Sequence, residues 1–224
     1  MAQDVSSYTA HRGWHPAHAG AVGARDPAAP GWLTRSACGS APKRTPGGPA
    51  WTRRSGRSPG PPGEALARYL LDHPEIVRGR DVIDIASGSG LVAIAAALAG
   101  AAAVTAYDID PLASAAIEAN AAANAVTVRA VCADVLDRDL PPPGTGLVLV
   151  ADAFYQRDLA TRVMRFASRA RACGATVLAA DFGRAYLPRD RLTPLAAYDV
   201  PGQLVTEDAD TKHTTIWTLA ERSA

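Results

Sequence analysis

Cysteine is scarce in the 224-residue sequence, and the scarcity excludes several classes of protein. The sequence has three cysteines, an odd number, and Cys38, Cys132 and Cys173 share no spacing typical of metal ligands. They therefore predict neither a disulfide framework nor a metal site. Reduced thiols of this kind are typical of a cytoplasmic protein.

Long apolar runs are also lacking. The longest, from Leu91 to Val104, has 14 residues, whereas a membrane-spanning helix needs about 20. The N-terminus contains no apolar segment of the kind that a secretory signal requires. We therefore expect no membrane association.

The distribution of charge is uneven along the chain. Residues 1–60 contain eight Arg and Lys residues against two acidic residues, and the rest of the chain contains 15 against 20. A mildly acidic main part argues against nucleic acid as its principal partner.

The first 60 residues are rich in Gly, Pro, Arg, Ser and Ala and show no hydrophobic periodicity. Such a segment cannot bury enough apolar surface to offset the entropy of ordering it, so we predict that residues 1–60 are disordered. Their Arg-rich, acid-poor composition also resembles an organelle transit peptide. One folded domain is expected over residues 61–224.

Strand and helix patterns alternate after Gly63. An amphipathic helix is expected first, interrupted at Pro74. We predict strands over 81–85, 103–107, 126–131, 146–151 and 175–180, and helices over 91–98, 111–123 and 159–172. The last strands, over 195–200, 204–206 and 214–219, have no helix between the final pair, which indicates an antiparallel hairpin. The expected fold is α/β, a doubly wound, mostly parallel sheet that ends in an antiparallel hairpin.

The stretch Asp84–Gly90 lies where the first predicted strand ends and a helix begins. Gly88 and Gly90 allow a ligand to approach the backbone, and the N–H groups of this turn, including that of Ser87, are available to polar groups. Asp108 follows the second strand, 20 positions after Gly88, where a carboxylate can accept both hydroxyls of a ribose. With the neighbouring Ile109, these residues predict a nucleoside cofactor.

The choice of nucleoside depends on Asp84. Residues 88–93 satisfy the dinucleotide pattern G-x-G-x-x-A, which favours a nicotinamide cofactor. A pyrophosphate, however, is repelled by a carboxylate in the same turn, whereas the amino and sulfonium groups of S-adenosylmethionine are cationic. We therefore predict S-adenosylmethionine. In the alternative, Asp84 only caps the following helix.

Further acidic and aromatic residues follow the third and fourth strands. Asp134 follows the third strand, where it either accepts a hydrogen bond from the adenine amino group or is a surface turn residue. Asp152 and Tyr155 follow the fourth, where the carboxylate could hold an amine and aromatic faces favour cations by roughly 0.5–2 kcal/mol. In the alternative, the aromatic residues pack the edge of the sheet. Asp110 is expected to cap the next helix.

From Gly63 to Trp217 the chain resembles the electron transfer flavoprotein β-subunit lysine methyltransferases, a branch of the seven-strand adenosylmethionine enzymes with a Rossmann-like fold. The resemblance rests on residues 63–72, 84–90, 108–111, 152–155 with 158–160, and Asp181-Phe182-Gly183-Arg184. It implies that Asp84, Gly88, Gly90 and Asp108 hold the cofactor, and that Asp152 and Tyr155 line a lysine channel. The implied partner is a protein, with the electron transfer flavoprotein β subunit as the leading substrate.

The chain departs from this family at two places. Ala86 stands where the family usually has glycine, and residues 57–62 stand where it has an aromatic, tryptophan-containing segment. We hypothesise that the N-terminal region is partly frameshifted or lies upstream of a misassigned start; a frameshift in the cell would impair acceptor binding. The alternatives are therefore a small-molecule, nicotinamide-like N-methyltransferase, a non-catalytic cofactor-binding protein and, more remotely, a nicotinamide-dependent oxidoreductase.

Overall fold

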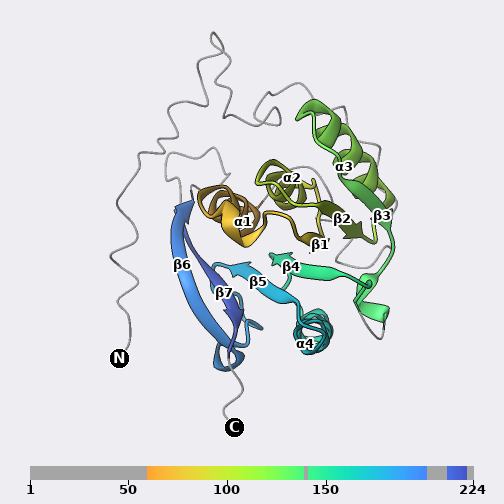
Figure 1. Ribbon diagram of the computed structural model, residues 1–224. Coiled ribbons are helices and arrows are strands. Elements are labelled where there is room, and N and C mark those ends of the chain that lie inside the picture. Colours follow the sequence, from red (N-terminus) through yellow and green to blue (C-terminus); the bar gives the residue numbers. More distant parts are fainter. Residues whose placement is uncertain (1–59, 139–140, 201–210, 221–224) are drawn as a thin grey trace, which may run out of the picture.

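A seven-stranded sheet organises the computed structural model, which describes residues 60–138, 141–200 and 211–220 (Figure 1). The strand order is β3-β2-β1-β4-β5-β7-β6. Strands β1 to β5 pair in parallel, and β7 is antiparallel to both β5 and β6. The strands are β1 (Asp81–Ile85), β2 (Ala103–Asp108), β3 (Arg129–Cys132), β4 (Thr145–Ala151), β5 (Thr176–Asp181), β6 (Leu192–Val200) and β7 (Lys212–Leu219).

Helices cover both faces of this sheet. The helices α1 (Pro61–Asp72), α2 (Leu91–Leu98) and α3 (Pro111–Ala123) lie on one face, and α4 (Arg157–Ala172) lies on the other (Figure 1). Short 3-10 turns occupy Pro74–Ile76, Val135–Asp137 and Arg189–Arg191. The described part of the chain therefore forms three layers, helix, sheet and helix, as the alternating sequence pattern predicts.

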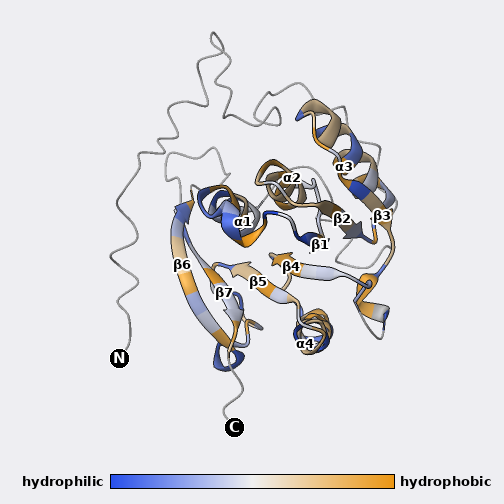
Figure 2. Cartoon of the chain, in the orientation of Figure 1, coloured by the Kyte–Doolittle hydropathy of each residue, from blue (hydrophilic) through white to orange (hydrophobic). Residues whose placement is uncertain are grey.

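Local sequence explains where these helices begin. Pro61 and Pro111 start α1 and α3, a position where the missing proline N–H costs nothing. The Asp110 side chain caps α3 by accepting a hydrogen bond from the backbone N–H of Leu112 at 2.9 Å, which confirms the predicted cap. Helix α2 is apolar throughout and contacts both α1 and α3, whereas α1 and α3 carry hydrophilic segments (Figure 2).

The two faces of the sheet bury separate apolar layers because successive strand residues point to opposite faces. In β1, Val82 packs under α1 and α2, while Ile83 packs toward α4. In β4, Leu147 and Leu149 belong to the first layer, and Val148 lies in the second. Strand β4 is buried on both sides, as its unbroken apolar sequence predicts.

Most predicted elements are confirmed within one or two residues, but the third strand starts later than expected. It was expected over 126–131 and spans Arg129–Cys132. Ala125 takes a left-handed conformation with φ of 54°, and the Val126 N–H bonds back to the Ala121 carbonyl at 3.1 Å. These apolar residues therefore close the end of α3 before pairing with β2 begins.

The C-terminal hairpin is confirmed by the antiparallel pairing of β6 with β7. Pro194 lies in β6, an edge strand, where its missing N–H is tolerated. The strand predicted over 204–206 and the disorder predicted for the N-terminal segment both lie outside the described residues. In the described ranges, no helix has both the length and the apolar character needed to cross a membrane.

Substitution of Gly90 tests the packing of the turn before α2. Gly90 has φ of 83°, and an added Cβ would lie 3.1 Å from Cγ1 and 3.2 Å from Cα of Ile117. Gly174 has a similar φ of 91° but nothing within 4 Å. We expect Gly174→Ala to lower the free energy of unfolding by about 1 kcal/mol through backbone strain. Gly90→Ala should cost roughly 1–3 kcal/mol more through overpacking, as measured by urea denaturation. Equal losses of unfolding free energy in the two variants would contradict a close contact between residue 90 and Ile117.

Candidate active site

The candidate site lies at the carboxyl ends of β1, β2 and β4, where the strand order reverses between β1 and β4. Ligands of open α/β sheets bind at such a switch point. A cavity of about 450 Å³ opens there, a size typical of small-molecule sites. All nine site residues predicted from the sequence except Gly90 line it: Asp84, Ser87, Gly88, Asp108, Ile109, Asp134, Asp152 and Tyr155.

Three hydrogen bonds hold the turn after β1 in place. The Ser87 N–H donates to the Tyr107 carbonyl of β2 at 3.1 Å, and the Gly90 N–H donates to the Ser87 carbonyl at 3.0 Å. The Asn120 side chain of α3 donates to the Ser89 carbonyl at 2.8 Å. Gly90 therefore shapes the turn without lining the cavity. Sequence reasoning missed Asn120, because nothing in its local sequence marks a contact 31 residues away.

Ala86, which stands where the related family usually has glycine, has a backbone conformation that favours glycine. Its φ is 54°, in the left-handed region that favours glycine, and it lines the cavity. Its methyl group is tolerated at a cost in backbone strain. The departure alters the energy of this turn, and the chain still takes the conformation that a glycine there would adopt.

Asp84 is buried, with 1% of its surface exposed. Burial raises the pKa of its carboxyl group to about 7. The Ser87 hydroxyl, which donates to Oδ2 at 2.5 Å, and the Ala93 backbone N–H oppose this increase, and the charge of Asp108 adds to it. The hydrogen bond from Ala93 joins the carboxyl group of Asp84 to the first turn of α2, whose N-cap residue is Gly90. A buried carboxyl group with this pKa is stabilised in its charged form by a bound cation.

Asp108 lies at the end of β2 and accepts two backbone hydrogen bonds. The Gly88 N–H donates to Oδ2 at 2.9 Å, and the Asp110 N–H donates to Oδ1 at 3.0 Å. These bonds hold the carboxylate beside the glycine turn. Each oxygen has a second lone pair, so the group retains the capacity to accept two hydroxyls. Ile109, 41% exposed, adds an apolar side chain to the same wall.

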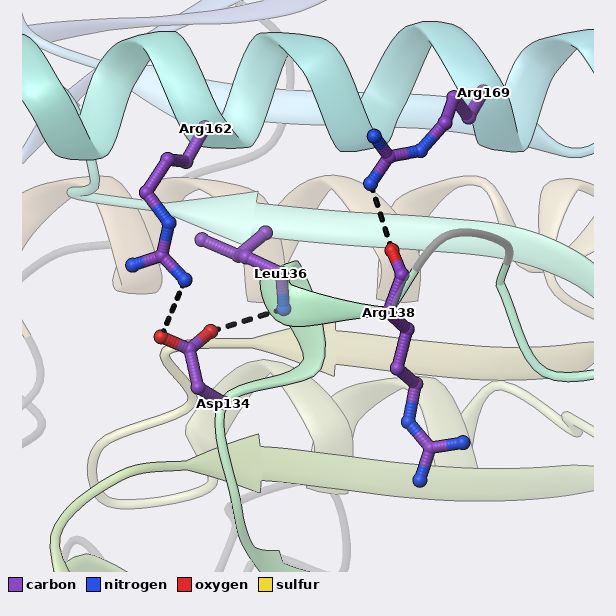
Figure 3. Close-up of polar contacts among 5 residues, drawn as sticks. All are labelled: Asp134, Leu136, Arg138, Arg162 and Arg169. Carbon is purple, nitrogen blue, oxygen red and sulfur yellow. Dashed lines mark hydrogen bonds and ion pairs between the residues drawn. The ribbon is translucent and has the colours of Figure 1, made fainter.

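Asp134 follows β3 and is joined to α4. Figure 3 shows its carboxylate between the Leu136 N–H, at 2.9 Å, and the Arg162 guanidinium, at 2.7 Å. Farther along α4, Arg169 donates to the Arg138 carbonyl at 2.7 Å. Asp134 lines the cavity, as expected, and it also caps the 3-10 turn over 135–137. Arg162 lines the cavity as well and carries a cation that the sequence interpretation did not include.

Asp152 follows β4 and forms an ion pair with Arg184. The Arg184 Nε and Nη2 atoms lie 2.6 Å and 2.5 Å from Asp152 Oδ1. The guanidinium lies 5.6 Å from the Tyr155 ring centre and 4.7 Å from that of Phe182. Phe154 is fully buried beneath the sheet, so the packing alternative holds for Phe154, whereas Tyr155 lines the cavity.

Arg184 is the main residue that sequence reasoning left without a role. It belongs to the D-F-G-R stretch, three residues after the end of β5. The Asp181 Oδ1 atom accepts hydrogen bonds from the Gly183 and Arg184 N–H groups, both at 2.6 Å, which fixes this loop. Burial raises the pKa of Asp181. The rule that ligands bind at strand ends would have identified Arg184 if it had been applied to the fifth strand.

An open hollow of about 510 Å³ adjoins the cavity and shares Tyr155, Gln156 and Asp158 with it. Its outer side is formed by Arg157 and Tyr186, whose guanidinium and ring centre lie 5.4 Å apart. The hollow therefore meets the cavity at Tyr155, Gln156 and Asp158. Among residues 60–138, 141–200 and 211–220, no group of three or more His, Cys, Asp or Glu side chains could hold a metal ion.

Asp84 makes the stability of the protein depend on pH. Its pKa is about 7 in the folded state against 3.8 for the ordinary side chain. The folded state therefore binds the proton more tightly, and stability falls as the pH rises from about 4 to 7. We expect Asp84→Asn to remove this slope, so that its melting temperature exceeds that of the wild type by several degrees at pH 8 and by less at pH 5. Parallel melting curves for the two proteins across this range would contradict the buried ionisation.

Comparisons with known proteins relate this chain to methyltransferases. Residues 65–157 match the family model described as ribosomal protein L11 methyltransferase (PrmA). The curated electron transfer flavoprotein β subunit lysine methyltransferase of Xenopus laevis is 36% identical over 165 residues, which cover 71% of this chain and 66% of the relative. The Rattus norvegicus protein of the same name is 33% identical, over 70% of this chain and 63% of the relative. The chain thus spans a little under two thirds of these relatives.

Solved structures support the fold alone. The ribosomal protein L11 methylase of Lactobacillus delbrueckii subsp. bulgaricus has a TM-score of 0.50 at 19% identity, covering 72% of this chain and 79% of that protein. Magnesium protoporphyrin IX methyltransferase from Synechocystis, solved with bound S-adenosylmethionine, has a TM-score of 0.51 at 13% identity, covering 70% and 78%. The chain is thus similar in sequence to the electron transfer flavoprotein β subunit lysine methyltransferases, and its seven-stranded sheet has the fold of these solved structures.

Proposed function

We propose that the protein is an S-adenosylmethionine-dependent N-methyltransferase that transfers methyl groups to lysine side chains of a protein. The observation that carries the proposal is the pair of carboxylates at adjacent strand ends, buried Asp84 and backbone-held Asp108, in one cavity of about 450 Å³. A cavity with this charge suits a nucleoside that carries cationic groups. The names of the curated relatives point to the same reaction.

Each residue of the cavity binds the part of the cofactor that suits its chemistry. Asp84 pairs with the amino group of the methionine part, and the second lone pairs of Asp108 accept the ribose hydroxyls. Ile109 packs against the adenine, and Asp134 accepts from its amino group. Nothing lies within 4 Å of a Cβ placed on Gly88, so there is open space beside the backbone of this turn. The ligand can therefore approach the backbone of Ser87 and Gly88 closely. When bound, the cofactor supplies a methyl group activated by the sulfonium.

The acceptor approaches through the hollow beside Tyr155. Asp152 lines the cavity and orients the attacking amine, while Tyr155, which lines both the hollow and the cavity, forms the wall of the channel. Methyl transfer needs alignment and exclusion of water more than acid–base catalysis. Because the relatives are named for the electron transfer flavoprotein β subunit, that protein is the first acceptor to test.

Transfer of label from the cofactor tests the proposed reaction. Incubating the protein with methyl-labelled S-adenosylmethionine and a cell lysate should label a protein band, and mass spectrometry should place the label on lysine. Purified electron transfer flavoprotein should be labelled in the same way. Label found only in small molecules would instead identify a nicotinamide-like N-methyltransferase, and cofactor binding with no labelled product would identify a non-catalytic protein.

Two alanine variants should separate cofactor binding from turnover. Asp108→Ala removes charged acceptors worth roughly 1.5–3 kcal/mol per hydrogen bond, so its affinity for S-adenosylmethionine should fall by about 100-fold or more in titration calorimetry. Asp152→Ala should bind the cofactor within about threefold of the wild type and lose most of its turnover. Equal loss of affinity in both variants would contradict the role of Asp152.

A further inference from the structure

Arg184 occupies the place in the site that is chemically suited to a cationic acceptor. Its guanidinium pairs with Asp152 and lies 5.6 Å from the ring centre of Tyr155 and 4.7 Å from that of Phe182. Carboxylates and aromatic faces are the groups that bind ammonium ions in proteins. The side chain of Arg184 is 15% exposed, so most of the guanidinium's surroundings are protein. The chain's own arginine thus fills a site for a positive charge.

A methyltransferase that acts on an amine has to bind the neutral form of that amine. The side chain of lysine has an ordinary pKa near 10.4 and is almost fully protonated at neutral pH. An ammonium nitrogen has no lone pair and cannot attack the methyl group. An uncompensated carboxylate beside the amine favours the charged, unreactive form. Asp152 alone would therefore oppose the reaction that it is positioned to assist.

We propose that Arg184 is a specificity-determining residue whose fixed positive charge compensates Asp152 and excludes the protonated form of the acceptor amine, so that the neutral amine is the form bound for reaction. The proposal rests on the proposed N-methyltransferase function. Asp152 Oδ1 receives both guanidinium contacts, whereas Oδ2 lies on the side of Gly60, where a Cβ would be 3.4 Å away.

The loop after β5 holds Arg184 in this position. Its backbone N–H donates to Asp181 Oδ1 at 2.6 Å, and Asp181 is 1% exposed. The Asp181 Oδ2 atom is buried and has no partner among the described residues. Asp152, directly after β4, has φ of 57°, a left-handed backbone conformation. The ion pair therefore joins two loops that follow adjacent strands.

Other charged groups face the same cavity from every neighbouring element. They are Asp84 after β1, Asp108 and Asp110 after β2, Asp134 after β3, and Asp158 and Arg162 of α4. Arg162 is paired with Asp134, and the cofactor's cationic groups face Asp84. Arg184 is thus the cation that balances Asp152, the carboxylate assigned to the acceptor amine.

The reaction step is balanced without a further reagent. The lone pair of the neutral amine forms the nitrogen–carbon bond, the carbon–sulfur bond breaks, and its electron pair remains on sulfur as a neutral thioether. The product nitrogen becomes a methylammonium ion and releases a proton to water through the open hollow. Before that proton is lost, the positive charge at Arg184 disfavours retention of the methylammonium ion.

The dependence of kcat on pH tests the proposal, because kcat reports ionisation in the bound complex. In Arg184→Gln the charge is lost while a polar side chain remains. We expect the acid limb of the kcat profile to move upward by about one pH unit, which lowers kcat by about tenfold at pH 7 and leaves it near the wild-type value at high pH. Arg184→Lys should restore the wild-type limb. A reduction by the same factor at every pH would show a structural role and overturn the proposal.

Arg162→Gln is the matched control. It removes an arginine that lines the cavity and that, like Arg184, is paired with an aspartate of the cavity, at 2.7 Å. Arg162 lies at the Asp134 end, away from the acceptor, so we expect changes in cofactor affinity with no shift of the acid limb. An equal shift in Arg162→Gln would show that any charge in the cavity has this effect and would contradict a specific role of Arg184.

A binding probe tests the same idea without turnover. Tetramethylammonium carries a permanent charge, and its binding to protein saturated with S-adenosylhomocysteine can be followed by saturation-transfer NMR. We expect Arg184→Gln to bind the ion at least tenfold more tightly than the wild type and Arg184→Lys to behave as the wild type. Equal binding by wild type and Arg184→Gln would overturn the proposal. Failure of the proposed function would appear separately, as a protein that excludes the cation but labels no acceptor.

Discussion

Burial of the Asp84 carboxyl group is the constraint on which the rest of the site depends. The group is 1% exposed, and burial raises its pKa to about 7. A carboxyl group in this position lowers the stability of the empty protein above neutral pH. The proposed function accounts for such a group at the end of a central strand, because a cationic ligand would restore the charge balance.

Backbone hydrogen bonds transmit this constraint to the neighbouring elements. The Ser87 hydroxyl holds Asp84, the Ser87 N–H bonds to β2, and the Gly88 N–H bonds to Asp108. The two carboxylates proposed to bind the cofactor are therefore parts of one hydrogen-bonded turn. Distortion of Gly88 or Ser87 should disturb both of them together.

The cavity has the same arrangement at its two ends. At one end Arg162 of α4 pairs with Asp134, and at the other Arg184 pairs with Asp152. Between them, Asp84 and Asp108 have no paired cation among the contacts that the described residues make with them. The unbalanced negative charge is thus concentrated in the middle of the cavity, where the proposed function places the ligand's cationic groups. Arginine at the acceptor end then discriminates between the charged and neutral forms of the amine.

The sequence by itself determined the strands and helices and showed which carboxylates directly follow the strands. The periodicity of apolar residues gave the strands and helices, and the position of Asp84, Asp108 and Asp152 directly after strands placed them at one edge of a parallel sheet. The antiparallel hairpin followed from the missing helix before the last strand. These features depend on local spacing, which a sequence states directly.

Tertiary structure alone decided the partners of those carboxylates and the ends of irregular segments. The β-branched residues after α3 predicted a third strand that begins at residue 126. In the structure the chain first turns at Ala125 to end α3, and β3 begins only at Arg129. Arg184 meets Asp152 across 32 residues, and Arg162 meets Asp134 across 28, through the pairing of strands and the packing of α4. Local spacing cannot report such contacts, because they form only when distant segments are brought together by burial of a common core.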